Sequence, residues 1–354
     1  MAASARSGPP GPYAAPVGAL GRVAANVWDK TVAGGVADLR RMPRTEVGRD
    51  PGGVLYRYAP LGPEEGPPVL LVPPLGAPDF AYDLRRGGSL VEHLLSRGRP
   101  VYLVDYGSMS FANRRLGIEH WVDGVVPRVV RAVGEPVHLV GWSLGGLFCL
   151  LATAAADLPV RTVTAIGSPV DVSAVPLVAP LRPVAEIAGG RAVSALYRAV
   201  GSFPAPLVSG VFHLTAVDRL VTKPLAVLSR LDDRDTLAQM EAVDHLMNSM
   251  HGYPGRAFGQ LFHLLLRAND LAAGRVDLGG RSLSLADIRA PVLVVAGLDD
   301  VIAPLRAVRG VVPLLTGAAQ VRFETAPGGH LGVLTGRRAR TTTWPILDSF
   351  LTDH

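Results

Sequence analysis

The chain has 354 residues, of which 48% are hydrophobic and 18% carry a formal charge. Such a chain can bury a large core, which excludes wholesale disorder and allows one large domain or two modest ones. Because Cys149 is its only cysteine, the chain cannot form an internal disulfide or a cysteine-based zinc or iron–sulfur site. The net charge of +5 comes from scattered arginines without a Lys/Arg-rich block, so we expect no nucleic-acid partner.

Residues 1–18 are rich in Pro, Ala and Gly and are predicted to form a disordered tail. The prolines in this tail interrupt the apolar segment that a secretory leader needs. The apolar run at residues 137–156 is broken by His138 and by a glycine-rich turn, which favours a strand, a turn and a helix over a membrane span. We therefore expect a cytoplasmic protein without a membrane span. Its oligomeric state stays open, and a homodimer is one option.

The next segment, residues 19–67, combines a helical pattern with a hairpin. Apolar residues recur at helical spacing over residues 18–41. Two short runs of strand-forming residues, at 45–47 and 54–58, flank Asp50-Pro51-Gly52-Gly53, which is typical of a hairpin turn. We expect the helix and the hairpin to pack on the core.

From residue 68 onward, short apolar runs alternate with helical stretches. Runs of this length predict buried parallel strands. The alternation predicts an α/β fold with a mostly parallel sheet and helices on both faces. The predicted strands lie at residues 69–72, 101–104, 137–140, 160–166, 292–296 and 321–323, and the predicted helices at 89–96, 118–133 and 144–156.

The alternation is interrupted between Ile166 and Val292 by a stretch with helical patterns, among them residues 236–250 and 256–266. A stretch this long is too large for a loop, so we expect a helical cap over the carboxyl edge of the sheet. The resulting boundaries are 68–168 and 287–354 for the two parts of the core and 169–286 for the cap. The apolar cap residues are compatible both with an acyl pocket and with ordinary helix core. These residues are Met240, Met247, Met250, Leu261, Phe262, Leu264, Leu265 and Leu266.

The sharpest motif is Gly141-Trp142-Ser143-Leu144-Gly145-Gly146, directly after a predicted strand. A serine on a turn from strand to helix needs small residues on both sides, because the strand and the helix approach each other closely there. The start of the following helix directs free N–H groups toward an oxygen bound at the serine. We therefore predict that Ser143 is a nucleophile rather than part of a merely structural glycine turn.

A serine nucleophile needs a base, and the base needs an acid that orients it. The last predicted strand leads to His330, which stands among glycines and is the predicted base. The preceding strand leads to Asp300, which we favour as the acid. The adjacent Asp299 and the more distant Asp171 are the alternatives.

An oxyanion hole requires two backbone donors. The N–H of Leu144, directly after the nucleophile, is one of them. Because Pro74 has no N–H, Leu75 or Gly76 must supply the other, and we choose Leu75. Cys149 lies on the helix after the nucleophile and faces away from it, so we expect a small core residue. The sequence has no recognisable metal-binding, phosphate-binding or dinucleotide-binding motif, and we expect no metal and no cofactor.

A family resemblance covers residues 68–350 and adds to this interpretation. It is carried by residues 78–84, 98–107, 139–146 and 269–271, and by 276–280 through Leu285 to Pro291. These segments resemble the catalytic domain of polyhydroxyalkanoate synthases, which belong to the α/β-hydrolase superfamily. Those proteins transfer 3-hydroxyacyl groups from coenzyme A thioesters onto a growing polyester. They carry cysteine where this chain has Ser143.

The resemblance implies an α/β-hydrolase fold and a small-molecule acyl ester or acyl-coenzyme A substrate. It also implies Ser143, Asp300 and His330 in the nucleophile, acid and base positions. Our leading hypothesis is a serine hydrolase that cleaves an ester or thioester through an acyl-enzyme on Ser143. The second is a polyhydroxyalkanoate synthase-like acyltransferase that uses 3-hydroxyacyl-coenzyme A. The third is a non-catalytic binding module, although such a module has no need of all three residues.

Overall fold

The computed structural model describes residues 18–32, 34–171, 173, 175, 202–203, 227, 230–261, 263–264 and 269–354. The predicted tail, up to residue 17, lies outside the described residues. So does most of the predicted cap between residues 176 and 229, together with Phe262, Leu265 and Leu266 of the suggested acyl pocket.

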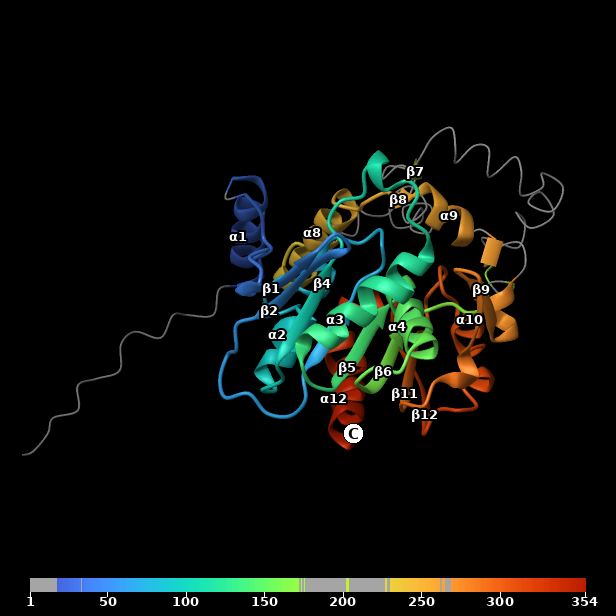
Figure 1. Ribbon diagram of the computed structural model, residues 1–354. Coiled ribbons are helices and arrows are strands. Elements are labelled where there is room, and N and C mark those ends of the chain that lie inside the picture. Colours follow the sequence, from blue (N-terminus) through green and yellow to red (C-terminus); the bar gives the residue numbers. More distant parts are fainter. Residues whose placement is uncertain are drawn as a thin grey trace, which may run out of the picture.

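An eight-stranded sheet lies at the centre of the molecule, in the order β1-β2-β4-β3-β5-β6-β11-β12 (Figure 1). The six strands from β4 to β12 in this order run parallel to one another. Strand β2 pairs antiparallel with β4, and β1 pairs antiparallel with β2. The predicted mostly parallel α/β sheet is therefore confirmed. The strands are β1 Arg44–Asp50, β2 Gly53–Tyr58, β3 Val69–Val72, β4 Val101–Asp105, β5 Val137–Trp142, β6 Val160–Ile166, β11 Val292–Gly297 and β12 Val321–Ala326.

Helices cover both faces of the sheet, which explains why its parallel strands are continuous apolar runs. In β3 all four residues are buried. Leu70 and Val72 join the apolar layer under α3 and α4, whereas Val69 and Leu71 join the layer under α2 and α12. These helices are α2 Leu90–Ser96, α3 Val126–Val133, α4 Leu144–Ala155 and α12 Thr343–Asp353.

Shorter helices connect these elements. The predicted helix at residues 118–133 begins with a π-helical turn, η3, before it continues as α3. The short helices are η1 Asp79–Tyr82, η2 Phe111–Asn113, η3 His120–Val125, η7 Asp270–Ala273, η8 Leu285–Asp287, α10 Leu305–Arg309, η9 Val312–Leu314, α11 Gly332–Thr335 and η10 Ala339–Thr341.

The N-terminal segment differs from the expectation in two ways. Helix α1, Ala19–Thr31, is shorter than expected because Gly34 and Gly35 adopt positive φ angles of 85° and 136°. Its side chains contact helix α8 (Arg234–Asn248) and the turn before it: Asn26 Nδ2 donates to the carbonyl of Leu231 at 2.7 Å, and Arg234 donates to Asn26 Oδ1 at 3.4 Å. The hairpin does not merely pack on the core but extends the sheet, because β2 pairs with β4.

The described part of the cap contains both helices and strands, namely β7 Ser202–Phe203, α8 Arg234–Asn248, β8 Tyr253–Pro254 and α9 Gly255–Leu261. The expectation of a helical cap is wrong at its C-terminal end, where β9 Arg275–Leu278 and β10 Arg281–Ser284 form a hairpin. Gly279 and Gly280, with φ angles of 58° and 83°, make the turn. The alternating Val276 and Leu278 are buried in the α3–α4 layer.

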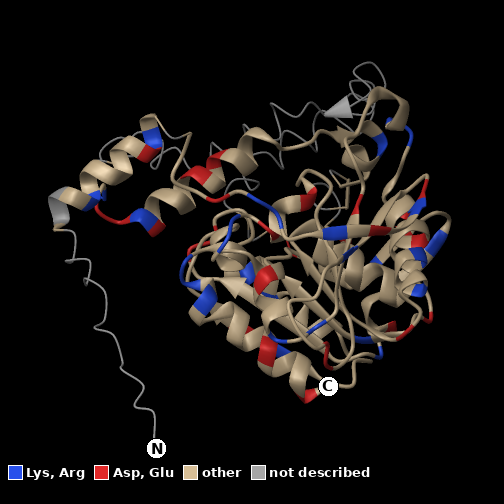
Figure 2. Cartoon of the chain, turned by 90° about the vertical axis from the view of Figure 1, so that its left-hand side faces the viewer, with Lys and Arg blue, Asp and Glu red and all other residues tan. Residues whose placement is uncertain are grey.

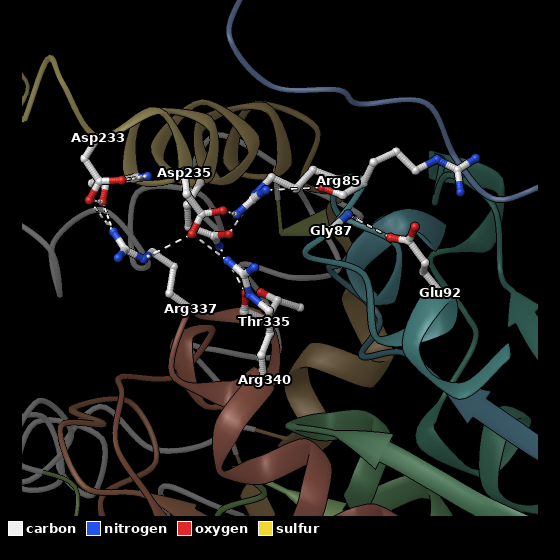
Figure 3. A network of polar contacts seen from close by, with 11 residues as sticks. Arg85, Gly87, Glu92, Asp233, Asp235, Thr335, Arg337 and Arg340 are labelled. Atoms are coloured by element: carbon white, nitrogen blue, oxygen red, sulfur yellow. Dashed lines mark hydrogen bonds and ion pairs between the residues drawn. The ribbon is translucent and has the colours of Figure 1, made fainter. Parts of the chain in front are cut away.

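The N-terminal end of α8 is fixed to the core by an ion-pair network (Figure 3). The carboxylate of Asp235 accepts hydrogen bonds from Arg85 and Arg340, each at 2.6 Å. Arg337 binds the neighbouring Asp233 at 2.7 Å. Although burial opposes the effect, Arg85 and Arg340 lower the pKa of Asp235. The network therefore keeps both carboxylates charged and holds α8 beside the C-terminal helices.

Charged residues are spread over the described surface. In the view of Figure 2, basic and acidic segments are intermixed rather than gathered on separate faces. In the part of the chain that the structure describes, none of the helices combines the length and the apolar character that a bilayer span requires. The cytoplasmic location and the homodimer stay predictions of the sequence.

Candidate active site

Ser143 lies on the turn between β5 and α4, with φ 55° and ψ −125°. A positive φ at a non-glycine residue persists only where the surrounding structure enforces it. A Cβ atom on Gly141 would lie 2.5 Å from the backbone of Gly145, and one on Gly145 would overlap the carbonyl oxygen of Val72. The predicted need for small residues on both sides of the serine is therefore confirmed.

Three polar side chains from different loops meet at this turn. His330 Nε2 lies 2.9 Å from Ser143 Oγ, and His330 Nδ1 lies 2.8 Å from Asp300 Oδ2. The other oxygen of Asp300 accepts hydrogen bonds from the N–H groups of Ile302 and Ala303, at 2.9 and 2.8 Å. The side chains of His330 and Asp300 are 4% and 0% exposed. Burial of this kind strengthens each polar contact, because little water competes for it.

The indole of Trp142 fixes the loop that carries His330. Its Nε1 donates to the carbonyl of His330 at 3.0 Å, and the two rings are tilted with their centroids 5.2 Å apart. The sequence predicts no separate role for Trp142. It shows that Trp142 precedes the predicted nucleophile, but it does not show the contact with His330, which lies far along the chain.

The two alternative acids have other partners. Asp299 Oδ2 accepts from the N–H of Gly328 at 3.2 Å, so this carboxylate contacts the histidine loop but not the imidazole. Asp171 accepts from Ser173 and from Asn269, the latter at 2.9 Å. Among the three aspartates that the sequence offered, the structure brings Asp300 to the histidine.

The loop after β3 lies beside the turn of Ser143 and contacts the cap. Within the loop, the N–H of Ala77 donates to the carbonyl of Pro74 at 3.1 Å. The carbonyl of Gly76 accepts from the N–H of His251 at 2.8 Å. The Tyr253 hydroxyl packs against Gly76, where an added Cβ would lie 3.0 Å from it. Burial raises the pKa of Tyr253 to about 12, and the neighbouring backbone of Gly76 opposes this rise.

These contacts bear on the choice between the two candidate donors. Gly76 is packed against the Tyr253 ring. Among the described residues, the N–H groups of Leu75 and Leu144 have no hydrogen-bond acceptor. Both residues are buried, at 1% and 9% exposure. Two N–H groups without an acceptor in the described part of the chain thus lie on the two loops that flank the histidine–serine contact.

Apolar cap residues join the core beside these donors. Leu264 belongs to the same apolar cluster as Leu75 and Leu144, and Leu261 packs against it. Met247 lies in the opposite layer. Among the described residues suggested for an acyl pocket, Leu261 and Leu264 therefore lie on the same side of the sheet as Leu75 and Leu144.

Cys149 is fully buried on α4, and burial raises the pKa of its thiol. The predicted small core residue is therefore confirmed. Over the described ranges, no group of three His, Cys, Asp or Glu side chains is arranged to hold a metal ion.

Comparison with known proteins places this geometry in context. Residues 69–341 match the model of the family described as the alpha/beta hydrolase family. The chain is 27% identical to a poly(3-hydroxyalkanoate) polymerase subunit PhaC from Allochromatium vinosum over 312 residues, which cover 85% of each protein. It is 25% identical to the protein of the same name from Synechocystis, over 88% of this chain and 84% of the relative.

Solved structures show the same fold. A monoacylglycerol lipase from Paleococcus ferrophilus matches with a TM-score of 0.54 and 19% identity, over 85% of this chain and 99% of the lipase. The alpha/beta hydrolase domain-containing protein 10 from mouse matches with a TM-score of 0.52 and 14% identity, over 88% and 98% of the two chains. At these identities the likeness concerns the fold alone.

Proposed function

Because the chain belongs to the alpha/beta hydrolase family, we propose that it is a serine hydrolase that cleaves an acyl ester or thioester through an acyl-enzyme on Ser143. One observation carries the proposal: the continuous hydrogen-bonded chain from Ser143 Oγ through His330 to Asp300. A serine hydroxyl is a weak nucleophile until a base removes its proton. This chain of contacts supplies the base and the group that orients it.

In the acylation step, Ser143 Oγ attacks the acyl carbon while His330 Nε2 takes the hydroxyl proton. The carbonyl oxygen becomes an oxyanion, which the N–H groups of Leu75 and Leu144 stabilise. The bond to the leaving group then breaks, and His330 returns the proton to the departing alcohol or thiol. The acyl group is left on Ser143 as an oxygen ester.

Asp300 keeps its charge throughout this step. Its carboxylate holds His330 Nδ1–H, which fixes the tautomer that leaves Nε2 free to accept a proton. The two backbone N–H groups that bind its other oxygen fix the carboxylate in place. The imidazolium that forms during catalysis is stabilised by this negative charge.

In the deacylation step, a water molecule takes the position of the leaving group. His330 Nε2 removes one of its protons as its oxygen attacks the acyl carbon, and a second oxyanion forms between the same two N–H groups. When this intermediate collapses, the proton passes to Ser143 Oγ and the free acid leaves. Serine, base and acid are restored.

A second candidate function is an acyltransferase in which a hydroxyl group of a 3-hydroxyacyl chain replaces this water. The names of the curated relatives favour it, because they are polymerase subunits that match 85% of this chain at 25–27% identity. The same acyl-enzyme serves both functions, and only the acceptor differs. A binding module without activity has no comparable support, since the family is one of enzymes.

The test is product analysis after incubation of the purified protein with 3-hydroxybutyryl-coenzyme A, with Ser143→Ala as the control. Free 3-hydroxybutyrate and free coenzyme A in equal amounts, absent with the variant, support the hydrolase. Oligoesters that depend on Ser143 support the acyltransferase instead. Equal turnover by the wild type and Ser143→Ala would refute both.

A further inference from the structure

The hydroxyl of Tyr82 lies between the carboxyl ends of β3 and β5, directly beneath the proposed site. The N–H of Trp142 donates to this hydroxyl at 2.8 Å, and the hydroxyl donates to the carbonyl of Val72 at 2.8 Å. The two strands are neighbours whose last paired residues are Val72 and Gly141. Tyr82 therefore bridges the strands at the point where their ladder ends.

This bridge lies at the end of the ladder between the two strands. At the other end of the same pair, the N–H of His138 donates directly to the carbonyl of Pro68 at 2.8 Å. The same offset between the strands would pair the N–H of Trp142 with the carbonyl of Val72. The Tyr82 hydroxyl contacts both of these groups and so links the ends of the two strands at their last ladder pair.

The chemistry of a buried phenol suits this insertion. Tyr82 is fully buried, and burial raises the pKa of its hydroxyl well above the ordinary value. The group therefore stays neutral, with one O–H to donate and lone pairs to accept. Its O–H donates to the carbonyl of Val72, and one of its lone pairs accepts from the N–H of Trp142. Since the position is closed to solvent, water cannot take over either contact.

The two bridged residues lead directly to the proposed oxyanion donors. Val72 ends β3 directly before the loop that carries Leu75, and Trp142 is two residues before Leu144. We propose that Tyr82 is a positioning residue, which sets the separation between the Leu75 and Leu144 N–H groups by fixing the ends of β3 and β5 relative to each other. This inference rests on the proposed function and concerns its transition state. The oxyanion exists only there, so Tyr82 influences turnover more than substrate binding.

The test compares Tyr82→Phe with Tyr58→Phe. Tyr58 is a matched control, because it is 1% exposed in the same apolar layer but ends β2, which lies two strands away from β3. The readouts are kcat and KM with an ester substrate, and the affinity for a phenylboronic acid that forms a tetrahedral adduct. We expect Tyr82→Phe to lower kcat about 10- to 100-fold, with KM within about threefold of the wild type.

The boronic acid separates positioning from general stability. Its affinity is expected to fall in Tyr82→Phe by about the same factor as kcat, whereas Tyr58→Phe retains both values even where its melting temperature falls. Should Tyr82→Phe fail to fold, Tyr82→4-aminophenylalanine, which keeps a donor and an acceptor on the ring, is expected to fold and to recover part of the wild-type kcat.

Three outcomes overturn the inference. One is a folded Tyr82→Phe protein with the kcat and boronic-acid affinity of the control. Another is a rise in KM with kcat unchanged, since that change belongs to substrate binding. The third is full wild-type kcat in the 4-aminophenylalanine protein, because a larger para group must displace the strands. If the wild-type protein neither hydrolyses esters nor binds the boronic acid, the proposed function itself is refuted.

Discussion

Two neighbouring loops at the carboxyl edge of the sheet, the turn of Ser143 and the loop after β3, are held in place by different means. The turn of Ser143 is fixed by its own sequence. Gly141 lets β5 and the start of α4 approach closely, since an added Cβ would lie 2.5 Å from the backbone of Gly145 and Gly146, and the carbonyl of Ser143 accepts from the N–H of Gly146 at 3.0 Å. The constraint lies within six consecutive residues of the chain.

The loop after β3 is held from outside. Tyr82 links Val72, the last residue of β3, to β5, and the cap contributes the N–H of His251 and the hydroxyl of Tyr253 at Gly76. These partners come from three separate places in the sequence. The comparison teaches that a catalytic turn can be encoded locally, whereas the donor that faces it depends on the assembled fold.

Ser143→Ala gives the largest expected effect and tests the chemistry of the turn without changing its shape. We expect ester or thioester turnover to fall by about 10⁴-fold or more, because the nucleophile is lost. Turnover is measured by release of free thiol from an acyl-coenzyme A. The melting temperature is the control, and a large fall in it would mean that the hydroxyl has a structural role.

Asp300→Asn and Asp299→Asn form a matched pair on adjacent residues. Asp300→Asn is expected to lower kcat by about 10³- to 10⁴-fold, because an amide favours the wrong histidine tautomer. Asp299→Asn weakens only a bond to the N–H of Gly328, so its loss is expected to stay under about tenfold. Steady-state kinetics of both variants measure these losses. A larger fall in kcat for Asp299→Asn than for Asp300→Asn would identify Asp299 as the acid.

Gly141→Ala tests whether the turn is fixed by close backbone approach. The added Cβ would lie 2.5 Å from backbone atoms of Gly145 and Gly146, so we expect a loss of about 3 kcal/mol or more in the free energy of unfolding. Gly62→Ala is the control, because nothing lies within 4 Å of its added Cβ and a change under about 0.5 kcal/mol is expected. Urea unfolding measures both. Equal midpoints would refute the local constraint.

The buried His138 makes the stability of β5, the strand before Ser143, dependent on pH. It is fully buried on β5, paired with Val69 of β3, and its Nδ1 lies 2.9 Å from Thr162 Oγ1. Burial, followed by the charges of Arg99 and Arg161, lowers its pKa from 6.5 to about 4. The unfolded chain therefore takes up a proton at a higher pH than the folded protein does.

The stability contributed by neutral His138 is present above pH 6.5 and is lost as the pH falls toward 4. Over that window we expect a loss on the order of 3 kcal/mol. His138→Leu is expected to flatten the slope, as measured by urea unfolding between pH 7 and pH 4. An unchanged slope would place the titrating group elsewhere.

The sequence predicted what depends on local pattern. The parallel strands follow from continuous apolar runs, and the constraint on the Ser143 turn follows from its glycines. The hairpin at Gly279-Gly280 was missed, although its alternating apolar residues and glycine pair are a local signal. In that case the surrounding helical patterns outweighed a short strand pattern.

The remaining features depend on contacts between distant parts of the chain. The sequence brought Tyr82 forward only as part of a family motif, because its two partners, at Val72 and Trp142, are defined by the assembled sheet. The same holds for Trp142 and the carbonyl of His330. Asp299 and Asp300 are neighbours in the sequence, so the sequence pattern does not distinguish them. The backbone geometry of their loop determines that the carboxylate of Asp300 binds the imidazole of His330.

The central claim is that Ser143 becomes acylated, and covalent labelling tests it most directly. The protein is treated with a fluorophosphonate, digested, and the modified peptide is identified by mass spectrometry, with Ser143→Ala treated in parallel. We predict a single phosphonate on Ser143, loss of turnover in proportion to labelling, and no label on Ser143→Ala. A label on another residue, or full turnover after complete labelling, would contradict the account.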